Sequence, residues 1–376
     1  MPQNVLILGG GIIGLSCAFE AARRGYRVRL VEPGRLGGQA SGAAAGMLAP
    51  YSENTEQPDE FFQLCLRSLR LFPEWIRDVE EASGLKADWV QSGSLNVFRH
   101  EADLLPAESR MRWHNAWGAK EELVTGAALR GLEPRLSSDA AFAVYSPEES
   151  HVYAPGLVAA LETACGKMGI DLIDHAGEML SMEIHSGGGA SVFMANLPGA
   201  LRADRLVICS GAWTGQFERW LGIAIPIHPI RGQICSYEGQ LEELRHMVFS
   251  SQAYWVGKRI GRIVCGASED VAGFDTSVTE RGIERLLRAS KQWFPMLAER
   301  ETAHRWAGLR PATADGLPLI GPVRGNPAIL MAAGHYRNGV LLSPATAKLT
   351  ADMLDGLTGG QSASVFSPER FTLVPR

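Results

Sequence analysis

The N-terminal stretch Val5-Leu-Ile-Leu-Gly9-Gly-Gly11-Ile-Ile-Gly14 decides the fold. Its apolar residues up to Leu8 predict a short buried parallel strand, and the three numbered glycines have the spacing of a turn that opens a helix. Gly9 permits the tight turn, Gly11 lets the backbone approach a pyrophosphate, and Gly14 allows the helix to pack closely on the strand. The stretch therefore predicts a strand–turn–helix whose helix N-terminus faces an anion.

The residues that follow complete a βαβ unit. We expect a helix over 12–24, which ends at Gly25, and a second strand over 27–32. Glu32 closes that strand, where an acidic side chain hydrogen-bonds a ribose 2′-hydroxyl and disfavours a 2′-phosphate. A glycine-rich turn alone can be purely structural. Its place between a strand and a helix, with Glu32 beyond, favours dinucleotide binding over that alternative.

Size and composition are those of an ordinary soluble globular protein with room for two domains. The chain has 376 residues and a mass of 40.7 kDa, and 46% of its residues are hydrophobic and 20% charged. A net charge of −5, with a pI near 6.0, argues against a non-specific nucleic-acid surface. No basic block interleaved with aromatic residues is present. We therefore expect no nucleic-acid partner.

The cysteines and apolar segments indicate a reducing compartment. None of the six cysteines has C-x-x-C spacing, and most lie in apolar runs, which favours buried free thiols over disulfides or a zinc site. The apolar N-terminus lacks a basic n-region and an A-x-A cleavage site, and no apolar stretch is long enough to span a membrane. We expect a cytoplasmic protein with free thiols at Cys17, Cys65, Cys165, Cys209, Cys235 and Cys265.

The remaining patterns alternate between helical and strand-like segments. A small-residue loop is expected over 37–47, and a helix over 59–81 that Pro73 breaks or kinks. Short alternating strands over 225–267 predict an antiparallel meander. Further helices are expected over 156–168, 280–294 and 343–357, and further strands over 170–173 and 206–209.

Parallel-sheet signals at both ends of the chain enclose these antiparallel ones. We therefore predict an α/β protein, α+β overall, with a Rossmann-like cofactor-binding domain built from discontinuous segments. A second domain with a large antiparallel sheet would bind the substrate. The expected boundaries are 1–85, 148–222 and 306–376 for the first domain and 86–147 and 223–305 for the second.

The choice between a nicotinamide and a flavin cofactor depends on the two ends of the chain. A nicotinamide enzyme normally completes its parallel nucleotide fold and then adds a catalytic domain. Here a small-residue loop over 40–47 follows Glu32 closely, and a glycine-rich turn leads into a helix that begins near Gly339. The N-terminal dipole of that helix suits the negative charge that a reduced flavin carries at N1 and O2. This favours FAD, although the 40–47 segment could also be a closely packed structural loop.

Four signatures give the chain its resemblance to a known family. They are GGGIIGLS (9–16), SGAAAGM (41–47), GLRPATADGLPLIG (308–321) and AAGHYRNGVLLSPATA (332–347). The chain resembles the FAD-dependent amino acid oxidases (the D-amino acid oxidase and sarcosine oxidase superfamily), and most of all the glycine oxidase branch that serves thiamine biosynthesis. Together with Gly9, Gly11 and Gly14, the resemblance implies an FAD site lined by Ile12, Ile13, Glu32, Pro33, Ala40, Ser41, Ala45, Gly46, Met47, Glu178, His335, Tyr336, Arg337, Asn338, Gly339, Val340 and Leu341.

Three residues are candidates for substrate binding. Arg310 lies between an apolar Trp306-Ala-Gly-Leu run and a proline, so a freely solvated surface arginine is not expected there. Its planar guanidinium can hold a carboxylate through two hydrogen bonds. Arg337 either contacts substrate or flavin, or braces its loop. Tyr254 lies in an alternating strand where packing is the common role, but the resemblance implies that its hydroxyl reaches the substrate carboxylate.

Other positions affect the polarity of the pocket. The family often carries a histidine where this chain has Gln252, and a methionine near the position of Glu269. His335 is interpreted as a cofactor-loop residue, since hydride transfer from the Cα of a neutral amino acid needs no protein base. We therefore expect no catalytic side chain in the strict sense. The sequence contains no recognisable Ser-His-Asp set, metal-ligand cluster or Walker A spacing.

The resemblance implies oxidative deamination of glycine and other small amines, such as sarcosine and D-alanine. Hydride would pass from Cα to flavin N5, O2 would become H2O2, and the imine would give glyoxylate and ammonia or feed thiazole synthesis for thiamine. The alternatives are a D-amino acid dehydrogenase or oxidase of broader specificity, which in the dehydrogenase case passes electrons to a membrane quinone, and a flavin-binding module without oxidase chemistry, for instance one acting on tRNA. Because no cysteine follows Cys265, we expect non-covalent FAD. The oligomeric state stays open, a homo-oligomer included.

Overall fold

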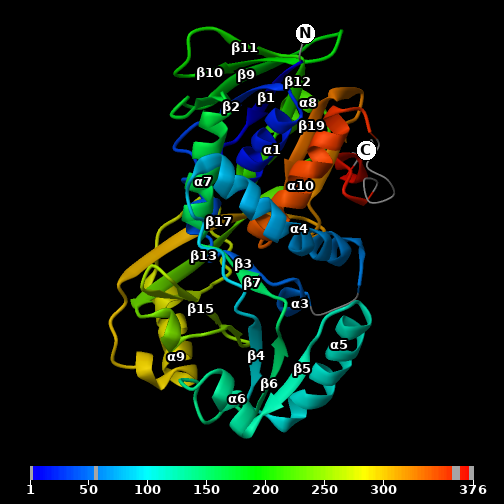
Figure 1. Cartoon of the computed structure of the whole chain (residues 1–376). Coiled ribbons are helices and arrows are strands. Elements are labelled where there is room, and N and C mark those ends of the chain that lie inside the picture. Colours follow the sequence, from blue (N-terminus) through cyan, green and yellow to red (C-terminus); the bar gives the residue numbers. More distant parts are fainter. Residues whose placement is uncertain (1–2, 55–57, 358–364, 372–376) are drawn as a thin grey trace, which may run out of the picture.

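The computed structural model describes residues 3–54, 58–357 and 365–371, which form two sheet-based regions joined in the middle of the molecule (Figure 1). The upper region in Figure 1 holds a six-stranded sheet with helices packed beside it. The lower region holds an eight-stranded sheet. This arrangement confirms the predicted mixed α/β fold.

The six-stranded sheet has the order β18-β19-β12-β1-β2-β8. β1 lies in its interior and pairs in parallel with β2 and β12, as expected for an opening βαβ unit. β19 continues the parallel pairing from β12, whereas β18 is antiparallel to β19. The strands come from distant parts of the chain: β1 (Asn4–Leu8), β2 (Arg27–Val31), β8 (Asp171–Ile173), β12 (Arg205–Ile208), β18 (Leu319–Val323) and β19 (Asn326–Ala333).

Four long helices share one apolar core with this sheet. They are α1 (Ile12–Arg23), α4 (Glu60–Ser83), α7 (Ala154–Lys167) and α10 (Gly339–Leu354). Pro73 does not break α4, which continues to Ser83. A proline inside a helix costs about 3 kcal/mol, but Phe72, Trp75 and Val79 are fully buried around it, and their burial offsets that cost. α10 begins at Gly339, the start that the glycine-rich turn indicated and four residues before the start of the 343–357 helical pattern, and it contains Pro344.

The eight-stranded sheet has the order β17-β13-β16-β15-β14-β4-β6-β5 and is antiparallel except between β14 and β4. The predicted meander over 225–267 is confirmed as β13 (Ile227–Glu238), β14 (Met247–Phe249), β15 (Tyr254–Lys258) and β16 (Arg262–Gly266). β17 (His304–Thr313) pairs with β13 along its whole length, so this segment joins the second sheet although it precedes β18 of the first. The sheet is completed by β4 (Ser94–Phe98), β5 (Glu122–Thr125) and β6 (Phe142–Ser146).

Smaller elements connect the two regions. The predicted loop over 37–47 contains one helical turn, α2 (Ala40–Ala43), followed by β3 (Met47–Leu48), which pairs with β7 (Ser150–His151). α3 (Pro50–Glu53) follows directly. The other elements are α5 (Leu104–Ala116), α6 (Gly126–Leu132), α8 (Glu218–Leu221), α9 (Glu280–Trp293), the three-stranded sheet β9 (Met179–Ile184), β10 (Ala190–Met194) and β11 (Ala200–Ala203), and short 3-10 turns at 101–103, 211–217, 241–243, 295–297 and 368–371.

The cysteines and the hydropathy of the helices bear on two further predictions. All six cysteines are buried and free of disulfides, as predicted. Within the described residues, no helix is both long and apolar enough to cross a membrane.

Candidate functional site

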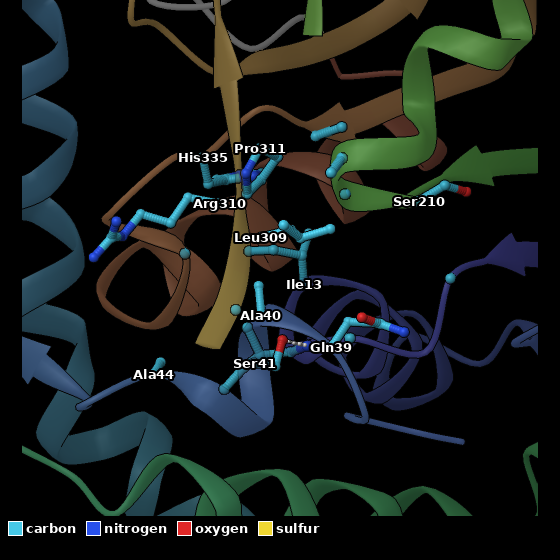
Figure 2. Close-up of a pocket in the computed structure, with 18 of the residues that line it drawn as sticks. Ile13, Gln39, Ala40, Ser41, Ala44, Ser210, Leu309, Arg310, Pro311 and His335 are labelled. Carbon is cyan, nitrogen blue, oxygen red and sulfur yellow. Dashed lines mark hydrogen bonds between the residues drawn. The ribbon is translucent and has the colours of Figure 1, made fainter. Parts of the chain in front are cut away.

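A cavity of about 660 Å³ lies where the two sheets meet. Its walls come from the end of β1, the start of α1, the 39–47 segment, strands β13 and β17, and the turn before α10. Figure 2 shows Leu309 and Arg310 on one strand, Ala40 and Ser41 on the short α2 turn, and Ile13 between them. Segments 300 residues apart in sequence therefore share one site.

The glycine turn is shaped by close backbone contacts. Gly9 has φ +109, and a Cβ on it would lie 2.4 Å from the carbonyl oxygen of Cys209. A Cβ on Gly14 would lie 1.9 Å from the carbonyl oxygen of Gly9. Gly11 differs, because a Cβ there would lie 3.2 Å from the Ser41 hydroxyl oxygen, at the cavity wall. Gly9 and Gly14 therefore permit the fold, and Gly11 leaves space for a ligand.

Two polar side chains tie the neighbouring loops to this turn. The backbone N–H of Ile12 donates to the Ser41 hydroxyl at 2.9 Å, across the start of α1 (Figure 2). Glu32 accepts hydrogen bonds from the backbone N–H groups of Gly10 at 2.7 Å and Gly34 at 3.1 Å. The carboxylate of Glu32 is thus fixed at the cavity wall, where sequence reasoning put a ribose-binding acid.

The small residues of the 40–47 segment are required by packing. A Cβ on Gly46, which has φ +75, would lie 2.0 Å from the carbonyl oxygen of Val152. A Cβ on Gly308 of β17 would lie 2.6 Å from the Cβ of Ala43. The segment is therefore a closely packed wall between β17 and β7, and it also lines the cavity. Its close packing matches the structural alternative, and its position in the cavity lining leaves contact with FAD as a prediction.

The opposite wall is the turn before α10. Gly334 and Tyr336 both have positive φ, +77 and +47, and the backbone N–H of Tyr336 donates to the carbonyl of Pro311 at 3.0 Å. This hydrogen bond ties the turn to β17. Among the residues that the structure describes, no side chain caps the N-terminus of α10, and Gly339 and Val340 line the cavity. The positive end of the helix dipole is therefore available to an anionic group in the cavity.

His335 in this turn is held as a neutral imidazole. Its side chain is buried, and Nε2 lies 3.0 Å from the Thr346 hydroxyl. Burial lowers the pKa of His335 to about 3. A neutral ring fits the predicted cofactor-loop role and does not add a positive charge near the cavity.

We expect the His335 ring to stay unprotonated between pH 5 and 8. Since its folded pKa lies below that of the unfolded chain, it contributes stability above about pH 6.5 that is lost as the pH falls toward 3. Histidine-labelled protein followed by NMR should show one ring signal that does not titrate in this range. The signal is assigned by its absence in His335→Gln, and its titration with a midpoint near pH 6 would contradict this prediction.

Arg310 owes its position to a glycine on the neighbouring strand. A Cβ on Gly232 of β13 would lie 2.5 Å from the guanidinium atoms of Arg310, so the side chain lies flat across that strand. Its NH1 donates to the carbonyl of Ser268 at 3.0 Å. Within the described residues, Arg310 has no ion pair, although it borders the cavity. A guanidinium in this setting can accept a carboxylate ligand.

Replacement of Gly232 by Ala should therefore displace the Arg310 guanidinium. We expect a loss of about tenfold to a hundredfold in kcat/KM for the amino acid substrate, because a shift of about 1 Å in a binding group costs that much. The cofactor absorbance should be unchanged, since Gly232 lies away from the glycine turn. Gly166→Ala is the matched control, because nothing lies within 4 Å of its added Cβ. Equal kinetics for the two variants would contradict the role of Gly232.

Tyr254 lies beside Arg310 on the cavity wall. A Cβ on Gly266 of β16 would lie 2.3 Å from its hydroxyl oxygen, so this cross-strand glycine makes room for the ring. Burial raises the pKa of Tyr254 to about 12, although the charges of Arg310 and Arg337 oppose that shift. The hydroxyl is therefore a protonated hydrogen-bond donor at neutral pH, as an anchor for a carboxylate requires.

The family comparison matches this geometry. The family model described as FAD dependent oxidoreductase covers residues 4–353, from the start of β1 to the last turn of α10. The chain belongs to the FAD-dependent oxidoreductases. FAD is accordingly its cofactor, as the sequence predicted.

Related FAD-dependent oxidoreductases match nearly the whole chain. The glycine oxidase of Geobacillus kaustophilus is 34% identical over 94% of this chain and 93% of its own length. A bifunctional protein ThiO/ThiG of Synechocystis is 30% identical over 98% of this chain and 54% of its own. The crystal structure of the Geobacillus kaustophilus glycine oxidase superposes with a TM-score of 0.92 at 32% identity, covering 98% of this chain and 99% of the other.

The residues of the cavity fit FAD. The glycine turn leaves a cradle beside Gly11, Glu32 is presented by two backbone hydrogen bonds, and the uncapped start of α10 lies across the cavity. Most residues predicted to bind FAD or substrate line this one cavity. They are Gly9, Gly11, Ile12, Ile13, Glu32, Pro33, Ala40, Ser41, Ala45, Gly46, Met47, Glu178, Tyr254, Arg310, His335, Tyr336, Arg337, Gly339 and Val340.

Three predicted FAD-site residues lie outside the cavity lining. Gly14 packs behind the turn, Asn338 is the N-cap residue of α10, and Leu341 is part of the apolar core. Sequence reasoning also missed residues that do line the cavity, among them Glu53, Trp213 and Gly232. Gly232 and Glu53 lie in segments without a recognisable motif. They are identified only by their contacts in the structure, Gly232 with the Arg310 guanidinium and Glu53 with Arg337.

Proposed function

We propose that this FAD-dependent oxidoreductase oxidatively deaminates glycine and other small amines such as sarcosine and D-alanine. The observation that carries the proposal is the Arg310 guanidinium, which borders the cavity beside the Tyr254 hydroxyl and has no ion pair among the described residues. A cation and a hydroxyl donor at one place suit the carboxylate of an amino acid. The similarity to two glycine oxidases over nearly the full length supports the choice of substrate.

Three residues of the cavity have proposed roles in this reaction. Arg310 binds the substrate carboxylate and Tyr254 donates a hydrogen bond to it, which together fix the orientation of Cα. Burial lowers the pKa of His335 to about 3, so its neutral ring is too weak a base to take a proton from the substrate. When bound in this cavity, FAD would supply the two-electron redox chemistry that oxidises the amino acid to an imine and reduces O2 to H2O2.

The imine product either hydrolyses to glyoxylate and ammonia or is passed on to thiazole synthesis for thiamine. A relative of Synechocystis that is named bifunctional protein ThiO/ThiG, of which this chain matches 54%, supports the proposal that the product is used further. We further propose a cytoplasmic location, which the six free cysteines support because such thiols persist in reducing compartments.

An anaerobic titration tests the proposed activity. Glycine, sarcosine and D-alanine are added in turn to the purified holoenzyme while the flavin absorbance is followed. Glycine should bleach the flavin, and air should restore the colour with release of about one equivalent of H2O2. A flavin that glycine leaves oxidised would refute the proposal. Bleaching without peroxide formation in air would instead favour the dehydrogenase that reduces a quinone.

FAD should be bound without a covalent link. Cys209 is a cysteine on the cavity wall, and hydrogen bonding with Cys17 together with burial raises its pKa well above the usual range, which keeps it an unreactive thiol. Acid precipitation of the yellow protein should therefore release all of the FAD into the supernatant, measured by its absorbance. Yellow colour that remains in the washed precipitate would contradict this prediction.

A further inference from the structure

Arg337 lies between two carboxylates at the substrate end of the cavity. Its NH2 is 3.1 Å from Oε1 of Glu53, and its NH1 is 3.1 Å from Oε1 of Glu269. The same oxygen of Glu269 accepts a hydrogen bond from the Tyr336 hydroxyl at 3.0 Å. The side chain of Glu53 is only 7% exposed, whereas that of Glu269 is 47% exposed. Glu53 and Arg337 line the cavity, and Glu269 lies outside this lining on the more exposed side of Arg337. These three charged side chains are called the Arg337 bridge.

The inner end of the Arg337 bridge is held rigidly. Glu53 is the last residue of α3, and the buried carboxylate of Glu149 accepts hydrogen bonds from the N–H groups of Tyr51 at 2.7 Å and Ser52 at 2.9 Å in that helix. The charge of Glu53 is the largest factor that raises the pKa of Arg337. Arg337 is thus a permanently charged group whose charge is already compensated.

The two arginines of the site consequently differ in what they offer a ligand. Arg310 donates to a neutral carbonyl, whereas Arg337 is paired with two carboxylates. The positive charges of both arginines act to lower the pKa of Tyr254 and of Tyr336. The two arginines therefore lie close enough to affect the same groups. Two arginines and two glutamates have a formal sum of zero. One bound carboxylate makes the group negative, and a second anionic group that approached Arg337 would meet a cation already paired with the carboxylates of Glu53 and Glu269.

We propose that Glu269 is a specificity-determining residue that restricts the site to ligands with a single carboxylate. This inference rests on the proposed function, because it assumes that Arg310 binds the substrate carboxylate. Glu269 forms an ion pair with Arg337, the cation that would otherwise bind a second anionic group of the ligand. Amino acids with an acidic side chain or an N-carboxymethyl group are thereby excluded by charge and not by size.

Ligand binding to the resting holoenzyme tests the proposal without turnover. Acetate and malonate are titrated separately, and the change in flavin absorbance gives the dissociation constant of each. In Glu269→Gln, which keeps the size of the side chain, the ratio of malonate to acetate affinity should rise by about fivefold to tenfold, as expected for removing one partly solvated charge near the ligand. Glu284→Gln, at an exposed position on α9, is the matched control and should behave as the parent protein.

Turnover gives the second measurement. D-asparagine and D-aspartate have nearly equal size and differ in one charge, so the ratio of their kcat/KM values isolates the effect of that charge. Glu269→Gln should change this ratio toward D-aspartate by a similar factor, and Glu53→Gln should act in the same direction.

The outcomes separate the two proposals. An unchanged ratio of malonate to acetate affinity in Glu269→Gln overturns the role of Glu269, even where both affinities rise by the same factor. A holoenzyme that no amino acid reduces refutes the proposed function, while the acetate and malonate titrations still report on Glu269.

Discussion

Arg310→Ala is expected to lose glycine oxidation by on the order of a hundredfold or more in kcat/KM. The guanidinium can make two charge-assisted hydrogen bonds to the substrate carboxylate, each worth roughly 1.5–3 kcal/mol. The side chain has no ion pair among the described residues, so its removal leaves no buried carboxylate unpaired. The loss therefore measures substrate binding. Steady-state kinetics with glycine and the flavin spectrum of the same preparation provide the two readouts.

Two further variants make this prediction sharper. Arg310→Lys should recover only part of the activity, because an ammonium group cannot form the planar fork that binds both carboxylate oxygens. Tyr254→Phe should be milder, since it removes one neutral donor worth roughly 0.5–1.5 kcal/mol. All three proteins should retain FAD. Glycine turnover within a few fold of the parent in Arg310→Ala would show that the carboxylate anchor is misassigned, and Arg337 would be the next candidate.

Gly11→Val should yield a colourless or unstable protein. The Cβ alone would lie 3.2 Å from the Ser41 hydroxyl, and the two methyl groups of valine would extend into the space left beside the glycine turn. Because the pyrophosphate approaches the backbone there, we expect FAD affinity to fall by on the order of a hundredfold or more. The ratio of flavin to protein absorbance after purification, followed by titration of the apoprotein with FAD, gives the size of the loss.

A control distinguishes loss of the cofactor from a general defect in folding. Gly166→Val introduces the same side chain into α7 at a place where nothing lies within 4 Å of the added Cβ. This variant should remain yellow. Gly11→Ala should fall between the two, since its single methyl group contacts Ser41 without filling the cradle. Full FAD occupancy in Gly11→Val would show that the pyrophosphate lies elsewhere.

The local patterns of the chain predicted its elements well where several independent signals agreed. The βαβ unit from Asn4 to Val31 was predicted within one residue at each boundary, because strand, turn and helix signals all agreed there. At Pro73, where a break or a kink was predicted, α4 continues without a break. The rule for proline considers only the backbone, whereas burial of Phe72 and Trp75 depends on α7 and α10, which pack against the same core.

By itself, the sequence determined the cofactor fold and the chemical types of the main cavity residues: a glycine turn, an acidic residue after the second strand and an arginine between apolar residues and a proline. These depend on short segments whose geometry is set by neighbouring residues. Only the tertiary structure decided that Gly232 supports Arg310 and that Glu53 and Glu269 compensate Arg337. The partners in these contacts are separated by tens to hundreds of residues. Strand register and core packing bring them together, so no local pattern records which charges face one another.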